Sequence, residues 1–177
     1  MKILWFFVEG ETDEEFLQRV IVPRLNPQFY VRWWRYARKP KEDRRKFIQA
    51  LHSPSFSQTA EYWILADKDQ CACFSACRDA VIMAFDGLPH RERIICPDRS
   101  IEVWYVAGFT SSDLFRRLEF PIVEGLHKNQ FDQIIQGCGY TMTQRSEILA
   151  SMLDGYNLDL ARQRSPSLDY FCRKLGI

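Results

Sequence analysis

This sequence of 177 residues lacks an excess of charge of one sign, a long apolar run and any low-complexity tract. Lysine and arginine number 24 and aspartate and glutamate 23, so the formal net charge of +1 gives no overall attraction toward nucleic acid. No apolar run approaches the roughly 20 residues that span a bilayer, and residues 1–8 lead into acidic residues without a cleavage-like signal. We therefore expect a cytoplasmic protein with no membrane association.

The residues that are present have the composition of one globular domain. Hydrophobic residues make up 46% and charged residues 27%, close to the average for folded domains. No linker divides the chain, so we predict one domain over residues 1–177, with a core over about 1–108 and a helical extension over about 109–177.

The six cysteines are expected to be reduced thiols rather than a disulfide framework. Three of them cluster, at Cys71, Cys73 and Cys77. A structural zinc site usually needs a second pair of ligands, and His90 with Cys96 gives only an irregular remainder. We therefore expect Cys73 and Cys77 to be buried in helix packing, with Cys71 beside an acidic pocket.

Apolar runs typical of strands alternate with helical spacing before Gly108. Thr12 and Glu15 form a capping box for the first helix, which Pro23 ends or kinks, and Pro54 with its serines is predicted to be a loop. Segment 101–107 is apolar but of undecided type. Strands are predicted over 3–8, 29–36, 61–66 and 92–95, and helices from Thr12, up to about 52, and over 74–85, 113–118, 131–137, 145–153 and 168–175.

This alternation predicts an α/β fold with a mainly parallel, Rossmann-like sheet flanked by helices. Acidic residues follow two of the strands directly: Glu9 after the first, and Asp67 and Asp69 after a later one. Ligands of open parallel sheets bind at the carboxyl ends of the strands, where these acids would meet. Their oxygens suit Mg²⁺ or Mn²⁺. Each acid also has a structural explanation, since Glu9 suits a helix N-terminus and Asp67 and Asp69 suit a solvated turn.

The segments VEGETDEEF and ILADKDQ resemble the signature of the Toprim family, a Glu-Gly after the first strand and an Asp-x-Asp after a later one. That family occurs in topoisomerases, primases and OLD-type nucleases. The resemblance implies acid or base work for Glu9 and metal binding for Asp67 and Asp69.

The sequence is most similar to a group of small stand-alone bacterial Toprim-like proteins of unknown function. IEVWY, at 101–105, is similar to their third motif, and SPSLDYF, at 165–171, to their terminal Ser-x-Ser segment. Many Toprim proteins have a further acid where this chain has Cys71, and a thiol is a poor ligand for Mg²⁺. Glu102 is the predicted replacement, with a strand-edge carboxylate in water as the alternative.

Segment 32–46 holds eight basic residues interleaved with Trp33, Trp34 and Tyr36, a pattern that suits phosphates and stacked bases. The alternative is a strand whose aromatic residues face the core, followed by a solvated helix. The predicted nucleic-acid contacts are Arg32, Arg35, Arg38, Lys39 and Lys68.

Together these features predict a divalent-metal-dependent phosphodiesterase or nuclease in bacterial defence or repair. Mg²⁺ or Mn²⁺ would be bound while Glu9 moves the proton, with Lys68 or Arg35 steadying the charge. The alternative is a non-catalytic partner subunit of an ATPase-containing defence complex. The substrate and the oligomeric state stay open. The four residues predicted to be both catalytic and metal-binding are Glu9, Asp67, Asp69 and Glu102.

Overall fold

The computed structural model describes residues 2–68, 71–85, 87–110, 123 and 125–177. The predicted metal ligand Asp69 and the predicted helix over 113–118 therefore lie outside the described residues.

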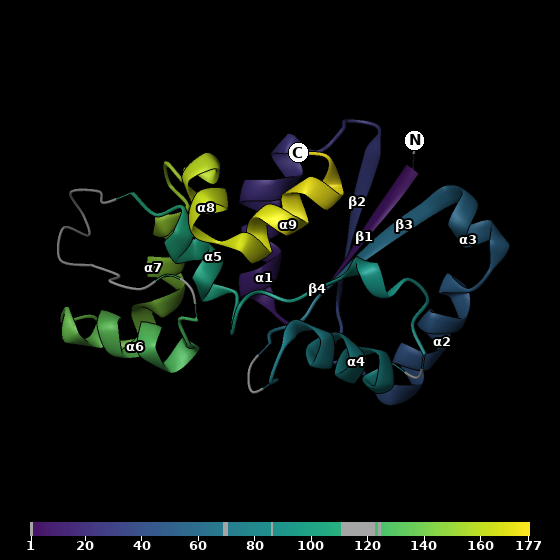
Figure 1. The fold of residues 1–177 in the computed structure, drawn as a ribbon, viewed down its shortest axis with the longest axis horizontal. Helices are drawn as coiled ribbons and strands as arrows, with labels where there is room; N and C mark the ends of the chain where they lie inside the picture. Colours follow the sequence, from purple (N-terminus) through teal and green to yellow (C-terminus); the bar gives the residue numbers. More distant parts are fainter. Residues whose placement is uncertain (1, 69–70, 86, 111–122, 124) are drawn as a thin grey trace.

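Within this part of the chain, four strands form one sheet in the order β2-β1-β3-β4, and all neighbours are parallel (Figure 1). In the register, Phe7 of the second strand in this order lies opposite both Trp34 and Ile64. The predicted parallel α/β sheet is confirmed. The strands are β1 (Lys2–Val8), β2 (Phe29–Arg35), β3 (Ala60–Leu65) and β4 (Ile94–Ile95).

Helices connect the strands and continue to the end of the chain. The first of them passes into a π-helical turn and then a 3₁₀ turn, which contains Pro23. The helical segments of the described residues are α1 (Glu11–Phe16), η1 (Leu17–Ile21), η2 (Val22–Arg24), α2 (Lys41–Leu51), α3 (Pro54–Thr59), α4 (Phe74–Ala84), η3 (Arg91–Arg93), α5 (Glu102–Ala107), α6 (Lys128–Gly137), η5 (Met142–Gln144), α7 (Arg145–Met152), α8 (Leu158–Arg164) and α9 (Pro166–Leu175).

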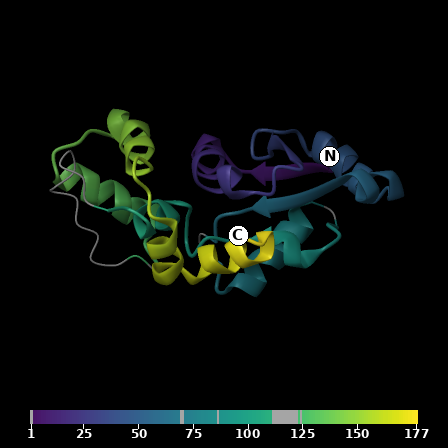
Figure 2. The ribbon, with the colours of Figure 1, turned by 90° about the horizontal axis from the view of Figure 1, so that it is seen from above.

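The two faces of the sheet bury separate hydrophobic clusters, because successive side chains of a strand point to opposite faces. Leu4, Phe6 and Val8 of β1 pack in the larger cluster, which also contains residues of α1, α5, α7, α8 and α9. Phe7 packs in the smaller cluster with residues of α2 and α4. Figures 1 and 2 both place α6 and α7 at one end of the molecule, away from the strands.

Several local predictions were wrong for identifiable reasons. The serine-rich segment after Ser53 is the helix α3 rather than a loop, because the Ser53 hydroxyl accepts a hydrogen bond from the Phe56 N–H and Pro54 occupies the first turn. The first helix is capped at Gly10 and not at Thr12.

Segment 101–107, whose type was undecided, contains the helix α5. The predicted strand over 92–95 is shortened to β4 by the 3₁₀ turn η3. The helix α8 was not predicted, although Asn157 caps it by accepting a hydrogen bond from the Leu160 N–H.

Candidate functional site at the carboxyl edge of the sheet

The parallel register brings Glu9 and Asp67 together, although 58 positions separate them in the sequence. Val8 ends β1 opposite Arg35 of β2, and β3 ends at Leu65, so the chain leaves all three strands at one edge. Glu9 Oε1 accepts a hydrogen bond from the Asp67 N–H at 3.1 Å.

Tyr36 completes the contact between these two strand ends from the third. Its N–H donates to the Val8 carbonyl at 3.0 Å, which continues the pairing of β2 with β1 by one residue. Its hydroxyl lies 2.8 Å from the Leu65 carbonyl oxygen and 3.1 Å from Glu9 Oε1. Burial, and then the negative charge of Glu9, raises the pKa of Tyr36, so this hydroxyl stays a hydrogen-bond donor. The sequence analysis had placed Tyr36 in the basic and aromatic segment.

Asp13 holds the turn that presents Glu9. Its Oδ2 accepts hydrogen bonds from the N–H groups of Glu9 at 2.8 Å and Gly10 at 3.0 Å. The side chain is buried, and burial raises its pKa from 3.8 to about 7, with further contributions from the charges of Glu9 and Glu102. The sequence analysis missed Asp13; its position three residues after the N-cap Gly10, where capping-box acids occur, was the available signal.

Asp67 ties the end of β3 to the start of α5. Its Oδ1 accepts a hydrogen bond from the Ile101 N–H at 3.0 Å, one residue before Glu102. The neighbouring Lys68 is directed elsewhere, with its ammonium 2.9 Å from Asp98 Oδ1 and 4.7 Å from the centre of the Phe74 ring.

Glu102 is the first residue of α5 and is buried, with 3% of its surface exposed. The alternative of a strand-edge carboxylate in water is therefore wrong. Glu102 Oε1 forms an ion pair with Arg145, whose Nε lies 2.7 Å from Asp132 Oδ1. Among the described residues, Glu102 Oε2 is buried without a hydrogen-bond partner. Neither Arg145 nor Asp132 stood out in the sequence.

Segments that carry the sequence resemblance pack together around Trp104. Its Nε1–H donates to the Ser167 hydroxyl at 2.9 Å, and its ring stacks on Phe171 with centroids 5.6 Å apart. Phe16, which ends the first motif, lies against Trp104 and Tyr105 at 5.5 and 5.2 Å. The aromatic residues and serine of these motifs therefore build the support beneath the acidic residues.

The donor chemistry of this edge fits a hard divalent cation. Glu9, Asp13, Asp67 and Glu102 share one electrostatic environment, since the charges of Glu9 and Glu102 raise the pKa of Asp13 and the charge of Asp67 raises that of Tyr36. The unsatisfied Glu102 Oε2 is an oxygen that a cation could bind. However, no group of three or more His, Cys, Asp or Glu residues in the described part of the chain is arranged to hold a metal ion. Complete coordination would therefore need Asp69 or a rearrangement.

The structure separates the basic residues of segment 32–46 from its aromatic residues. Trp33 stacks on Phe6 and Trp34 on Phe47, so both rings pack on the core, as the alternative interpretation expected. Arg35 forms ion pairs at 2.7 Å with two acids of α1. The remaining predicted nucleic-acid contacts of this segment, Arg32, Arg38 and Lys39, are exposed.

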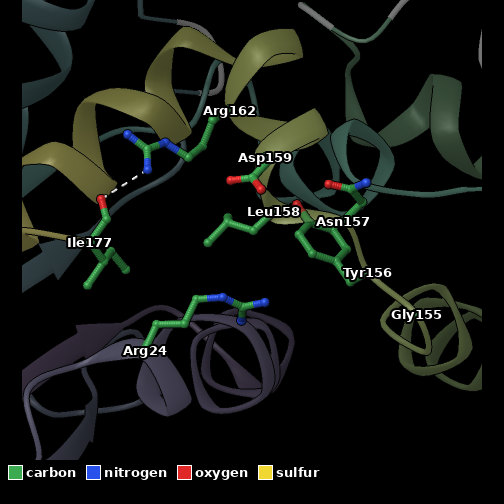
Figure 3. Close-up of a pocket in the computed structure, with 8 residues that line it drawn as sticks. All are labelled: Arg24, Gly155, Tyr156, Asn157, Leu158, Asp159, Arg162 and Ile177. Carbon is green, nitrogen blue, oxygen red and sulfur yellow. Dashed lines mark hydrogen bonds between the residues drawn. The ribbon is translucent and has the colours of Figure 1, made fainter.

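A pocket of about 660 Å³ lies at a different place, between η2 and the C-terminal helices (Figure 3). Arg24 and Arg162 line it from opposite sides, together with Tyr156 and Asp159. Arg162 Nη1 donates to the main-chain oxygen of Ile177 at 3.0 Å. None of the predicted site residues lines this pocket.

Comparison with protein-family models, curated proteins and solved structures finds no match to this chain. Among the described residues, no helix is long and apolar enough to cross a membrane.

Proposed function

We propose that this chain is a divalent-metal-dependent phosphodiesterase of Toprim type that acts on nucleic acid. The observation that supports the proposal best is the hydrogen bond between Glu9 and the Asp67 main chain, which joins two acidic segments at the edge where parallel sheets bind ligands. The buried oxygen of Glu102 without a partner among the described residues adds to it.

In this proposal Asp67, Asp69 and Glu102 hold Mg²⁺ or Mn²⁺, and Glu9 moves a proton at the phosphate. When bound, the cation would neutralise phosphate oxygens and activate water. The Tyr36 hydroxyl and the Asp67 N–H orient the Glu9 carboxylate. Asp13 fixes the Glu9 main chain from below. The exposed Arg32, Arg38 and Lys39 lie on the β2 side of the sheet and supply positive charge for a nucleic-acid backbone.

The test is cleavage of end-labelled DNA and RNA, single- and double-stranded, by the isolated chain with Mg²⁺, Mn²⁺ or EDTA. The variants are Glu9→Gln and Asp67→Asn, and Glu42→Gln on the exposed face of α2 is the matched control. We expect metal-dependent cleavage that falls by at least about 100-fold in both site variants and is unchanged in the control, because positioned acid-base groups contribute about that much.

Circular dichroism of each variant separates loss of activity from loss of folding. Cleavage that survives in both site variants would contradict the proposed site. If the folded chain neither cleaves nor binds Mn²⁺ in calorimetry, the enzymatic proposal is wrong for the isolated chain, and the partner-subunit alternative is favoured.

A further inference from the structure

Two buried thiols lie in contact beneath the carboxyl edge of the sheet. Cys77 comes from the first turn of α4, and Cys96 follows β4 directly. Their sulfur atoms are 2.9 Å apart, with the Cys96 S–H directed at the Cys77 sulfur. Only 2% and 4% of these residues are exposed.

The surrounding elements hold these sulfur atoms in place. Both cysteines belong to the smaller core cluster, and Arg78, next to Cys77, donates from Nε to the Ile94 carbonyl of β4 at 3.0 Å. A disulfide bond has a sulfur–sulfur length of about 2.05 Å, so bond formation needs the sulfurs to approach by less than about 1 Å. Side-chain movement alone can supply this.

A cavity of about 240 Å³ leads to one of the two thiols. Cys96 lines it together with Phe74, Arg78 and Tyr170, whereas Cys77 does not. The hydrogen bond with Cys96, followed by burial, raises the pKa of Cys77, so that thiol stays protonated. Because nucleophilic attack on an oxidant needs the thiolate, Cys96 is the thiol that reacts first.

We propose that Cys77 and Cys96 are an oxidative modification site that forms a reversible intramolecular disulfide on exposure to a peroxide. The Cys96 sulfur takes one oxygen from hydrogen peroxide, giving a sulfenic acid and one water. The Cys77 sulfur then attacks that sulfur, the S–O bond breaks, and the hydroxyl leaves as a second water with the Cys77 proton. Two thiols and one peroxide thus give one disulfide and two waters.

This modification would alter the segment that carries Asp67. The Cys77 S–H now donates to the Asp67 carbonyl oxygen at 3.6 Å, and disulfide formation removes that donor. The bond chemistry itself does not rest on the proposed hydrolysis, because it needs only the two sulfurs and an oxidant.

The test is peptide mapping of the full chain by mass spectrometry after treatment with hydrogen peroxide under native, dilute conditions. The expected result is a mass loss of two hydrogen atoms, a single Cys77–Cys96 cross-linked peptide, and full reversal by dithiothreitol. The wild-type map gives the answer even if substitution of a buried cysteine disturbs folding.

Variants then distinguish this pair from its neighbours. The cross-link should vanish in Cys77→Ala and in Cys96→Ala, and should persist in Cys73→Ser, which changes an exposed thiol at the N-cap of α4. It should also persist in Cys71→Ser, although the Cys71 thiol also bonds to Cys77. A cross-link through Cys71, or an uncross-linked pair in folded protein whose Cys73 has been oxidised, would overturn the proposal.

Discussion

At the scale of single residues, the candidate site is a concentration of negative charge that the fold pays to keep. Asp13 shows this best, because its carboxyl is buried, accepts two main-chain N–H groups, and lies near the charges of both Glu9 and Glu102. The main-chain donors favour the ionised form, but burial outweighs them, and the pKa rises to about 7. Asp13 therefore changes its charge near neutral pH.

This shift predicts how stability depends on pH in the metal-free protein. The pKa of the folded state, about 7, lies above the ordinary value of 3.8, so the folded state binds the Asp13 proton more tightly. The stabilising contribution is complete below about pH 4 and is lost as the pH rises to about 7, by about 4 kcal/mol at most. Chemical denaturation at several pH values, in EDTA, measures it.

Asp13→Asn supplies the comparison, because an amide oxygen can accept the same two hydrogen bonds without titrating. We expect the variant to be more stable than the wild type at pH 8 and similar to it near pH 4. Equal pH dependence of the two proteins would show that Asp13 titrates normally.

At the scale of elements, the end of α5 is held against the segment that leads into α8. The Tyr156 hydroxyl donates to the Trp104 carbonyl, and the Asn157 N–H donates to the Gly108 carbonyl at 3.0 Å. Gly108 makes this close approach possible, since a Cβ there would lie 2.3 Å from the Tyr156 ring. The glycine is needed for space, because its φ of −100° is open to any residue.

Gly108→Ala should therefore destabilise the protein by about 1 to 3 kcal/mol, because the added methyl group forces the buried Tyr156 ring away. Gly137→Ala is the matched control: it lies at the end of α6, where a Cβ meets nothing within 4 Å. Its effect should be neutral or stabilising, by up to about 1 kcal/mol. Urea denaturation compares the two, and equal effects would argue against the packing at Gly108.

At the scale of the whole molecule, buried charges join the C-terminal helices to the sheet. Arg145 begins α7 and reaches both Glu102 of α5 and Asp132 of α6. The larger core cluster also runs without interruption from Leu4 of β1 to Phe171 of α9. The acidic edge and the helical extension therefore depend on each other for position.

Arg145→Gln should lower the free energy of unfolding by on the order of 3 kcal/mol, because it leaves the buried Glu102 charge without its partner. The control is Arg173→Gln on α9, an exposed member of an i,i+4 pair with Asp169, which should change stability by less than about 0.5 kcal/mol. A small effect of Arg145→Gln, measured by thermal and urea denaturation, would show that Glu102 is neutral in the folded state.

The sequence by itself determined the elements whose patterns are local. The apolar runs that became β1 and β3 are each bounded by polar or turn residues, and their alternation with helices predicted a parallel sheet. A parallel sheet in turn required Glu9 and Asp67 to leave the sheet at the same edge. The hydroxyl cap at Ser53 was equally local, but the serines around Pro54 were interpreted as a loop.

Only the tertiary structure decided which distant residues meet at that edge. The Tyr36 hydroxyl on Glu9, the burial of Asp13, the Arg145 ion pair of Glu102 and the contact of Cys77 with Cys96 all join segments or environments that no local pattern specifies. Burial depends on everything packed around a group, so the raised pKa of Asp13 follows from the fold and not from its neighbours in the sequence. Sequence spacing placed the acids at the ends of strands, whereas packing set the charge and the partners of each one.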